Sequence, residues 1–227
     1  MSDRTEGLIP EGFIKPSQTV LVLTDAVYFA ADWAKPFGKY GPVDGTFTTL
    51  DGTEVDVSFM QELELADRRG VADGFVGAEI PYAGDDYSML GLVPDEGRYD
   101  ELIERLDQEL LDEIDATFTT GPYGLLLPTW DDEYQIDLLG RLTEIGAAPG
   151  SYPKITPTAF LGAAVHAADI TVDVAGTVAA AATALGFEES GPPEPELIVA
   201  ADRPFIYLIR HRDSGLVLFV GHVTDPS

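Results

Sequence analysis

Catalytic chemistry requires nucleophiles, acid–base groups or metal ligands in recognisable patterns, and this sequence offers few of them. It contains three histidines and no cysteine. The histidines are too few and too widely spaced in the sequence to indicate a metal centre, and no thiol can act as nucleophile or ligand. A phosphate-binding glycine loop and a Gly-x-Ser-x-Gly motif are both absent. We therefore predict that the chain is not an enzyme and uses no metal or cofactor. An unrecognised hydrolase is the alternative, because a Ser–His–Asp triad can be assembled on paper from any protein with these residues.

The segment from Gly176 to Pro195 has the most unusual composition in the chain. It begins with Gly176-Thr177-Val178, continues through four consecutive alanines (Ala179, Ala180, Ala181 and Ala182) to Thr183, and ends in glutamates and prolines. Read as a strand, it has one uncharged face that could enter a sheet core, made of Thr177, Ala179, Ala181, Thr183, Leu185 and Phe187. Alanine also has the highest helix propensity, so a short helix or a small-residue linker is the alternative. The segment is therefore conformationally ambivalent.

The charge balance excludes several classes of partner. The chain of 227 residues carries 40 acidic and 13 basic residues, a formal net charge of -27. Nucleic acids and anionic membranes are bound through clustered lysine and arginine, so we expect neither as a partner. The first residues, Met1–Gly7, contain no apolar signal core, and no apolar run reaches membrane-spanning length. The sequence leaves the compartment, secreted or cytoplasmic, open.

Apolar runs and turn residues predict an α+β chain with many antiparallel strands and a few helices. Asp51-Gly52 is the strongest hairpin signal, between strands expected at 47–49 and 55–59. Leucine and isoleucine at helical spacing predict a helical region from Tyr99 to Phe118, ended by Gly121 and Pro122. The other expected elements are strands at 19–29, 75–81, 87–93, 123–130, 163–174, 197–201, 205–210 and 216–223, and a short helix at 138–145.

Two groups of acidic residues stand out among the expected strands: a run of three after the strand at 123–130, and one aspartate within the strand at 19–29. Asp131, Asp132 and Glu133 predict a solvated turn rather than a calcium site, because the spaced ligands and glycine of a calcium loop are missing. Thr19–Phe29 is a nearly continuous apolar run, which suits a strand buried on both faces. Asp25 lies in the middle of it and needs a partner, since an unpaired buried carboxylate is costly.

Several blocks of the sequence, taken in order, resemble the serpin family of serine protease inhibitors. The blocks are Thr24-Asp25-Ala26-Val27-Tyr28-Phe29 with Trp33 and Pro36-Phe37; Ile80-Pro81-Tyr82 with Tyr87-Ser88-Met89-Leu90 and Val93-Pro94-Asp95; Val165-His166-Ala167-Ala168; Gly176-Thr177 with the alanine run; and Ala201-Asp202-Arg203-Pro204-Phe205-Ile206-Tyr207. Each block alone is a weak signal. Five blocks in the family's order, spanning nearly the whole chain, are a specific match.

The resemblance implies a serpin-like α+β fold, mostly antiparallel β-sheets with a few helices, in a single domain over residues 1–227. Residues 176–195 would be the reactive loop, and Gly176 to Thr183 its hinge. In inhibitory serpins the target protease cleaves this loop and is held as an acyl-enzyme, while the loop inserts as a new strand of the main sheet. Such stored strain is a recognised switching mechanism. The resemblance also implies that Asp25 and His166 meet beneath the opening of that sheet, so that an imidazolium would neutralise the buried acid.

The resemblance to serpins implies a cleaved bond in this loop and leaves two assignments of it. Counting forward from Gly176 by the family's usual spacing implies Ser190–Gly191, whereas counting back from Pro192-Pro193 implies Glu189–Ser190. Glu189 before the bond would suit a target serine protease that is glutamate-specific, with a basic specificity pocket. Inhibition of serine proteases by loop cleavage and insertion is thus the leading hypothesis. The alternative is a non-inhibitory, β-rich interaction module, or an incomplete fragment that cannot trap a protease.

Three departures from the family pattern bear on this choice. Val178 stands where inhibitory members commonly have glutamate, and Asp25 stands where they have asparagine. Serpins also begin with a mostly helical half that has no counterpart here, so the chain is expected to be truncated at its N-terminus and to match the C-terminal three-fifths of a serpin. Without the strands of that half, Thr19–Phe29 would have an open edge. We therefore expect either self-association through this strand or insertion of the chain's own loop from the start.

Overall fold

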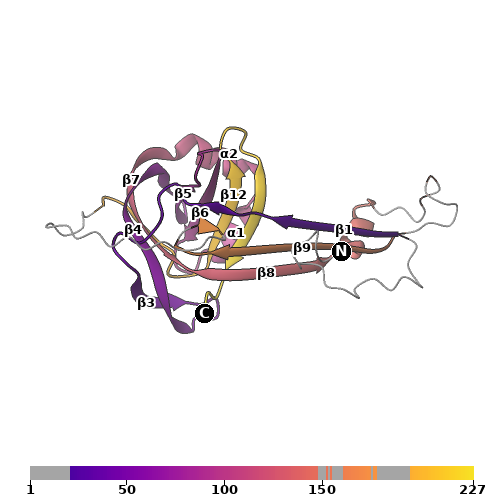
Figure 1. Cartoon of the computed structure of the whole chain (residues 1–227), viewed down its shortest axis with the longest axis horizontal. Helices are drawn as coiled ribbons and strands as arrows, with labels where there is room; N and C mark the ends of the chain where they lie inside the picture. Colours follow the sequence, from indigo (N-terminus) through magenta and orange to yellow (C-terminus); the bar gives the residue numbers. More distant parts are fainter. Residues whose placement is uncertain (1–20, 148–151, 153, 155–160, 175, 178–194) are drawn as a thin grey trace. The chain divides into compact units, whose positions relative to one another are not determined.

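The computed structural model describes residues 21–147, 152, 154, 161–174, 176–177 and 195–227. These form two compact units. The first comes from Met1–Phe29 and Asp131–Ile170, and the second from Ala30–Trp130 and Thr171–Ser227. The single domain expected over residues 1–227 stays a prediction, and each unit is described here by itself (Figure 1).

The second unit is built on an eight-stranded sheet. Its strands are β3 (Val43–Thr48), β4 (Glu54–Ala72), β5 (Phe75–Pro81), β6 (Tyr87–Pro94), β7 (Thr119–Pro128), β11 (Ile198–Ala200), β12 (Phe205–His211) and β13 (Val217–Val223). The order is β11-β7-β4-β5-β6-β12-β13, with β3 against β4. All neighbours are antiparallel except β11 and β7, which are parallel. The expected hairpin at Asp51-Gly52 is present, with Gly52 at a positive φ of 86°.

Two helices cover one face of this sheet because their apolar residues recur at helical spacing. They are α1 (Tyr99–Arg105) and α2 (Gln108–Thr117), and Figure 1 shows both beside β6 and β12. The core between them and the sheet comprises Phe75, Leu90, Leu92, Leu102, Leu110, Leu111, Ile114, Phe118, Ile206 and Leu208. The one helical region expected from Tyr99 to Phe118 is thus two helices. The chain breaks at Leu106, and Asp107 then caps α2 by accepting a hydrogen bond from Leu110 N at 3.0 Å.

The first unit contains long neighbouring strands, which Figure 1 shows as β1, β9 and β8. They are β1 (Leu21–Tyr28), β8 (Trp130–Asp137) and β9 (Leu161–Val172), with the short helix α3 (Leu139–Glu144) after β8. β1 runs parallel to β9, and β8 also pairs with β9. Most residues of β8 and β9 lie in this unit, but Trp130 and the last two residues of β9 belong to the second. In the second unit, β9 ends beside the two-residue strands β10 (Gly176–Thr177) and β2 (Ala31–Asp32).

Three local expectations from the sequence are wrong. Asp131, Asp132 and Glu133 do not form a turn but continue β8, which pairs only with β9 among the described strands. Such an edge strand keeps room for charged side chains. Gly121 and Pro122 do not end a helix but lie within β7. β11 pairs with β7 only at Gly124–Leu126, so at Pro122 strand β7 is paired with β4 alone in the described part of the chain. One side of β7 is therefore an edge at this point, where proline, which has no N–H, is tolerated.

The third error concerns the strand at Thr19–Phe29, which was expected to be buried on both faces. Leu23 is 50% exposed and the Asp25 side chain is 62% exposed in the described part of the chain. The face that carries these two residues is therefore not covered by the described residues. The apolar run was a correct signal for a strand, but hydrophobicity alone did not show what would pack on each face.

Candidate functional site

The candidate site is the region where the segment 176–195 leaves and rejoins the fold. At its start, the backbone of Gly176 pairs with Asp32, and that of Thr177 pairs with Ala31 on one side and Val172 on the other. The expected hinge thus begins with a two-residue strand that pairs antiparallel with the end of β9. The rest of the expected hinge, Val178, Ala179, Ala180, Ala181, Ala182 and Thr183, lies outside the described residues, as do Glu189, Ser190 and Gly191.

Asp173 and Val174, just before the expected hinge, are held by residues 33–37, which we call the anchor segment. Trp33 Nε1 donates to the carbonyl of Asp173 at 2.9 Å, and Phe37 N donates to the carbonyl of Val174 at 2.9 Å. Trp33 is 1% exposed and stacks on Tyr82, with ring centroids 4.6 Å apart. A backbone bridge joins the same two residues. A buried indole thus satisfies its N–H on the chain directly upstream of the hinge.

The far end of the segment is fixed to the eight-stranded sheet. Gly124 N on β7 donates to the carbonyl of Leu197 at 2.8 Å, and the parallel pairing of β11 with β7 begins one residue later, at Ile198. A Cβ atom on Gly124 would lie 2.7 Å from Cγ of Pro195, so only glycine lets the chain approach here. The chain that follows the segment is therefore held first by the close approach of residues 195–197 to Gly124 and then by strand β11.

Asp25 and His166 are brought together by the pairing of β1 with β9 in the first unit. The two residues are direct neighbours in the parallel register, and Asp25 Oδ2 lies 3.0 Å from His166 Nδ1. The site is not buried as expected, because the His166 side chain is 29% exposed and that of Asp25 is 62% exposed. Solvent can therefore reach both groups, and the contact is an ion pair only when the imidazole is protonated.

Sequence reasoning assigned no role to the lysines of this region. Lys35 lies in the anchor segment and contacts Glu62 and Glu64 of β4, and Lys39 contacts Glu64. The hydrogen bond from Lys39 lowers the pKa of the exposed Glu64 carboxyl. The sequence did offer one sign of this cluster, because Lys35 and Lys39 are four residues apart in a chain with few basic residues. Only the fold shows which acidic residues they contact.

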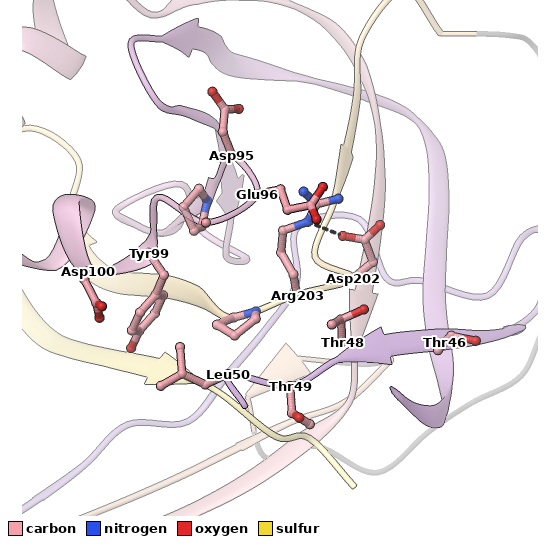
Figure 2. Close-up of a pocket in the computed structure, with 13 residues that line it drawn as sticks. Thr46, Thr48, Thr49, Leu50, Asp95, Glu96, Tyr99, Asp100, Asp202 and Arg203 are labelled. Carbon is pink, nitrogen blue, oxygen red and sulfur yellow. Dashed lines mark hydrogen bonds and ion pairs between the residues drawn. The ribbon is translucent and has the colours of Figure 1, made fainter. Parts of the chain in front are cut away.

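A separate cleft of about 420 Å³ in the second unit contains none of the expected site residues (Figure 2). Asp95, Glu96, Asp100 and Asp202 line it with Arg203, which donates from Nε to Asp202 Oδ1 at 2.8 Å. That hydrogen bond raises the pKa of Arg203. Within the described ranges, no group of three or more histidine, aspartate or glutamate side chains is arranged to hold a metal ion. The helices described there are also too short or too polar to cross a membrane.

Known proteins resemble this chain over almost its whole length. The family model described as Serpin (serine protease inhibitor) matches residues 1–226. An uncharacterized serpin-like protein of Methanosarcina acetivorans is 32% identical, over 99% of this chain and 54% of its own length. Neuroserpin of Mus musculus is 33% identical, over 96% of this chain and 56% of its own length.

Solved structures agree with these sequence matches. The thermophilic serpin tengpin in its native state has a TM-score of 0.83 and 26% identity, over 99% of this chain and 60% of its own. Human thyroxine-binding globulin, with a TM-score of 0.83 and 24% identity, shares the fold. The chain spans less than two thirds of the length of these relatives. From the match over residues 1–226 and this common fold, we conclude that the chain belongs to the serpin family.

Proposed function

We propose that this chain inhibits serine proteases by presenting residues 176–195 as a reactive loop that is cleaved and then inserts between β1 and β9. The main support is the direct parallel pairing of these two strands, from Leu21↔Leu161 to Tyr28↔Asp169, with no strand between them. This is an uninserted sheet, so the expectation of a loop inserted from the start is not met in this structure. The edges of β1 and β9 that an inserted loop would pair with are already paired with each other.

The hinge has the direction that insertion requires. Thr177 runs antiparallel to Val172 at the end of β9, so a strand that continues from it would be antiparallel to β9 and to β1, which is parallel to β9. Insertion would replace one parallel ladder by two antiparallel ladders, the slightly more stable arrangement. The eight paired residues of β1 suggest a net gain of roughly eight hydrogen bonds, on the order of 10 kcal/mol. Burial of the uncharged face from Thr177 to Phe187 would add to it.

The proposed chemistry belongs to the protease, and this chain supplies the substrate bond. The catalytic serine of the protease would attack the carbonyl carbon of Glu189, the Glu189–Ser190 bond would break, and the new amine of Ser190 would take the proton. The protease then remains joined to Glu189 as an ester. If the loop inserts before water hydrolyses this ester, the protease is trapped; if it inserts later, the chain is only a substrate. Ser190–Gly191 is the other candidate bond.

A non-inhibitory interaction module is the second candidate, and one observation favours it. Strand β1 pairs with β9 alone among the described strands, and its outer edge has no lysine or proline between Thr19 and Phe29 to discourage pairing. We propose that this edge self-associates, which size-exclusion chromatography with light scattering would show as a dimer or larger species.

Incubation with a panel of serine proteases, including a glutamate-specific one, tests the inhibitor hypothesis. A complex that survives SDS, with the protease joined to residue 189 or 190 by mass spectrometry, supports inhibition. Ala181→Arg would place a charge on the face proposed to be buried and should abolish the complex, whereas Ala182→Arg on the opposite face is the matched control. Cleavage of the loop with full protease turnover in the wild-type chain would support the interaction module instead.

A further inference from the structure

A buried carboxylate lies beside the anchor segment and is not explained by the fold alone. Glu62 on β4 is 0% exposed. Its Oε1 accepts from Lys35 Nζ at 3.1 Å and from the backbone N–H groups of Leu63 and Glu64 at 3.0 Å each. Its Oε2 is buried and has no hydrogen-bond partner among the described residues. A buried charge of this kind is retained at a cost, and it becomes strongly destabilising if the cation that contacts it, Lys35, is removed.

The backbone N–H groups that bind the Glu62 carboxylate come from an irregularity in β4. The pairing of β4 with β7 shifts between Glu62 and Leu65, and successive backbone N–H groups of such a bulge can converge on an anion. Lys35 binds this bulge at two points, because its Nζ also donates to the carbonyl of Glu64 at 2.9 Å. The anchor segment is therefore attached to β4 at one defined position, although Lys35 itself is 40% exposed.

The bulge and the exit of the proposed reactive loop both lie beside Gly124 on β7. Leu63, between the two glutamates, lies 3.2 Å from the position that a Cβ atom on Gly124 would occupy, and Pro195 lies 2.7 Å from it. On the hinge side, Phe37 lies two residues after Lys35, and its backbone N–H donates to the carbonyl of Val174. A chain of neighbouring groups thus runs from Val174 through the anchor segment and the bulge to Gly124, and from Gly124 to Pro195.

We propose that Lys35 is a positioning residue that, through Glu62, holds the two ends of the reactive loop at fixed places in the fold. This inference rests on the proposed function. Because the chain just before the expected hinge is the pivot of insertion, a loose pivot slows insertion while cleavage of the loop is unchanged. The predicted consequence of losing Lys35 is a change in partition: more chain is consumed as substrate for each protease trapped.

The test compares Lys35→Met with Lys39→Met, which removes a neighbouring lysine that is paired with the exposed Glu64. Amide hydrogen exchange reports the anchoring without any protease. We expect the Phe37 amide to exchange about tenfold faster in Lys35→Met, the change that loss of one charge-assisted hydrogen bond produces, and to be unchanged in Lys39→Met. Lys35→Arg, which can still donate to both acceptors, should restore the wild-type rate.

The moles of chain consumed per mole of protease trapped should rise about threefold or more in Lys35→Met, with the rate of loop cleavage unchanged. The variant Lys35→Met/Glu62→Gln separates positioning from stability, because it removes the uncompensated charge without restoring the link. It should recover the melting temperature but not the partition. Recovery of both, or equal exchange at Phe37 in all variants, overturns the proposal. If no protease is trapped even by the wild-type chain, the proposed function fails, and the exchange experiment still decides the role of Lys35.

Discussion

The charged cluster around Glu79 allows a sharp prediction about stability. Glu79 on β5 is 1% exposed and Arg210 on β12 is 3% exposed. Glu79 Oε1 accepts from the guanidinium of Arg210 and from Arg68 Nη1 at 2.8 Å, and Arg210 Nη1 donates to Asp115 Oδ1 at 3.0 Å. Glu79 is therefore the only buried acid that Arg210 contacts in the described part of the chain, since the Asp115 side chain is 43% exposed.

Removing one partner of a buried ion pair costs more than removing both. Glu79→Met leaves Arg210 buried with a single half-exposed acid. Arg210→Met leaves the buried Glu79 with two partly exposed arginines, Arg68 and the more distant Arg212. Each variant should therefore lower the free energy of unfolding by roughly 3–5 kcal/mol. In the double variant the remaining Arg68–Asp115 pair, 2.8 Å apart, stays intact. Methionine fills the space of both side chains, so the double variant should lie within about 2 kcal/mol of the wild type.

Urea denaturation followed by tryptophan fluorescence measures this cycle in the relevant unit, because both tryptophans, Trp33 and Trp130, lie in the second unit with the cluster. The slope of the free energy with urea should be the same in all four proteins, which would show that only stability has changed. If the double variant is as unstable as the sum of the two single variants, the two residues do not act as a pair, and the reasoning from burial is refuted.

Three further predictions follow from single contacts. Burial opposes the charge on Asp115, but interactions with the arginines outweigh burial and lower the pKa of the Asp115 carboxyl. The stability from this charge is present above the unfolded pKa and is lost as pH falls through the folded pKa. Asp115→Asn should therefore weaken the loss of unfolding free energy that the wild type shows at acidic pH, measured by urea denaturation at a series of pH values. Asp107→Ala removes the N-cap of α2 and should cost about 1 kcal/mol in urea denaturation, whereas Asp107→Ser should cost little. A Cβ at Gly221 would overlap the buried ring of Tyr207, so Gly221→Ala should lower stability by roughly 1–3 kcal/mol, whereas Gly91→Ala, with only a carbonyl oxygen 4.0 Å away, should not.

The sequence by itself determined the elements whose signals are local. The hairpin at Asp51-Gly52 and the strand β5 at Phe75–Pro81 were predicted because turn residues and apolar runs act within a few residues. The ordered blocks of residues identified the family, which the match over residues 1–226 confirms. Local signals failed where neighbours decide: Asp131–Glu133 form a strand rather than a turn, because β9 supplies the ladder that their composition could not reveal.

Only the tertiary structure decided which residues meet at the candidate site. Asp25 and His166 are 141 positions apart, and their contact follows from the register of two parallel strands, which no local pattern encodes. The contact of Lys35 with Glu62 likewise depends on a bulge in β4 that composition does not show. Burial too was set by packing, since the apolar run of β1 indicated a strand but not the exposure of Asp25. Hydrophobic pattern fixes the type of an element, whereas its partners and its exposed face depend on the chain distant in sequence.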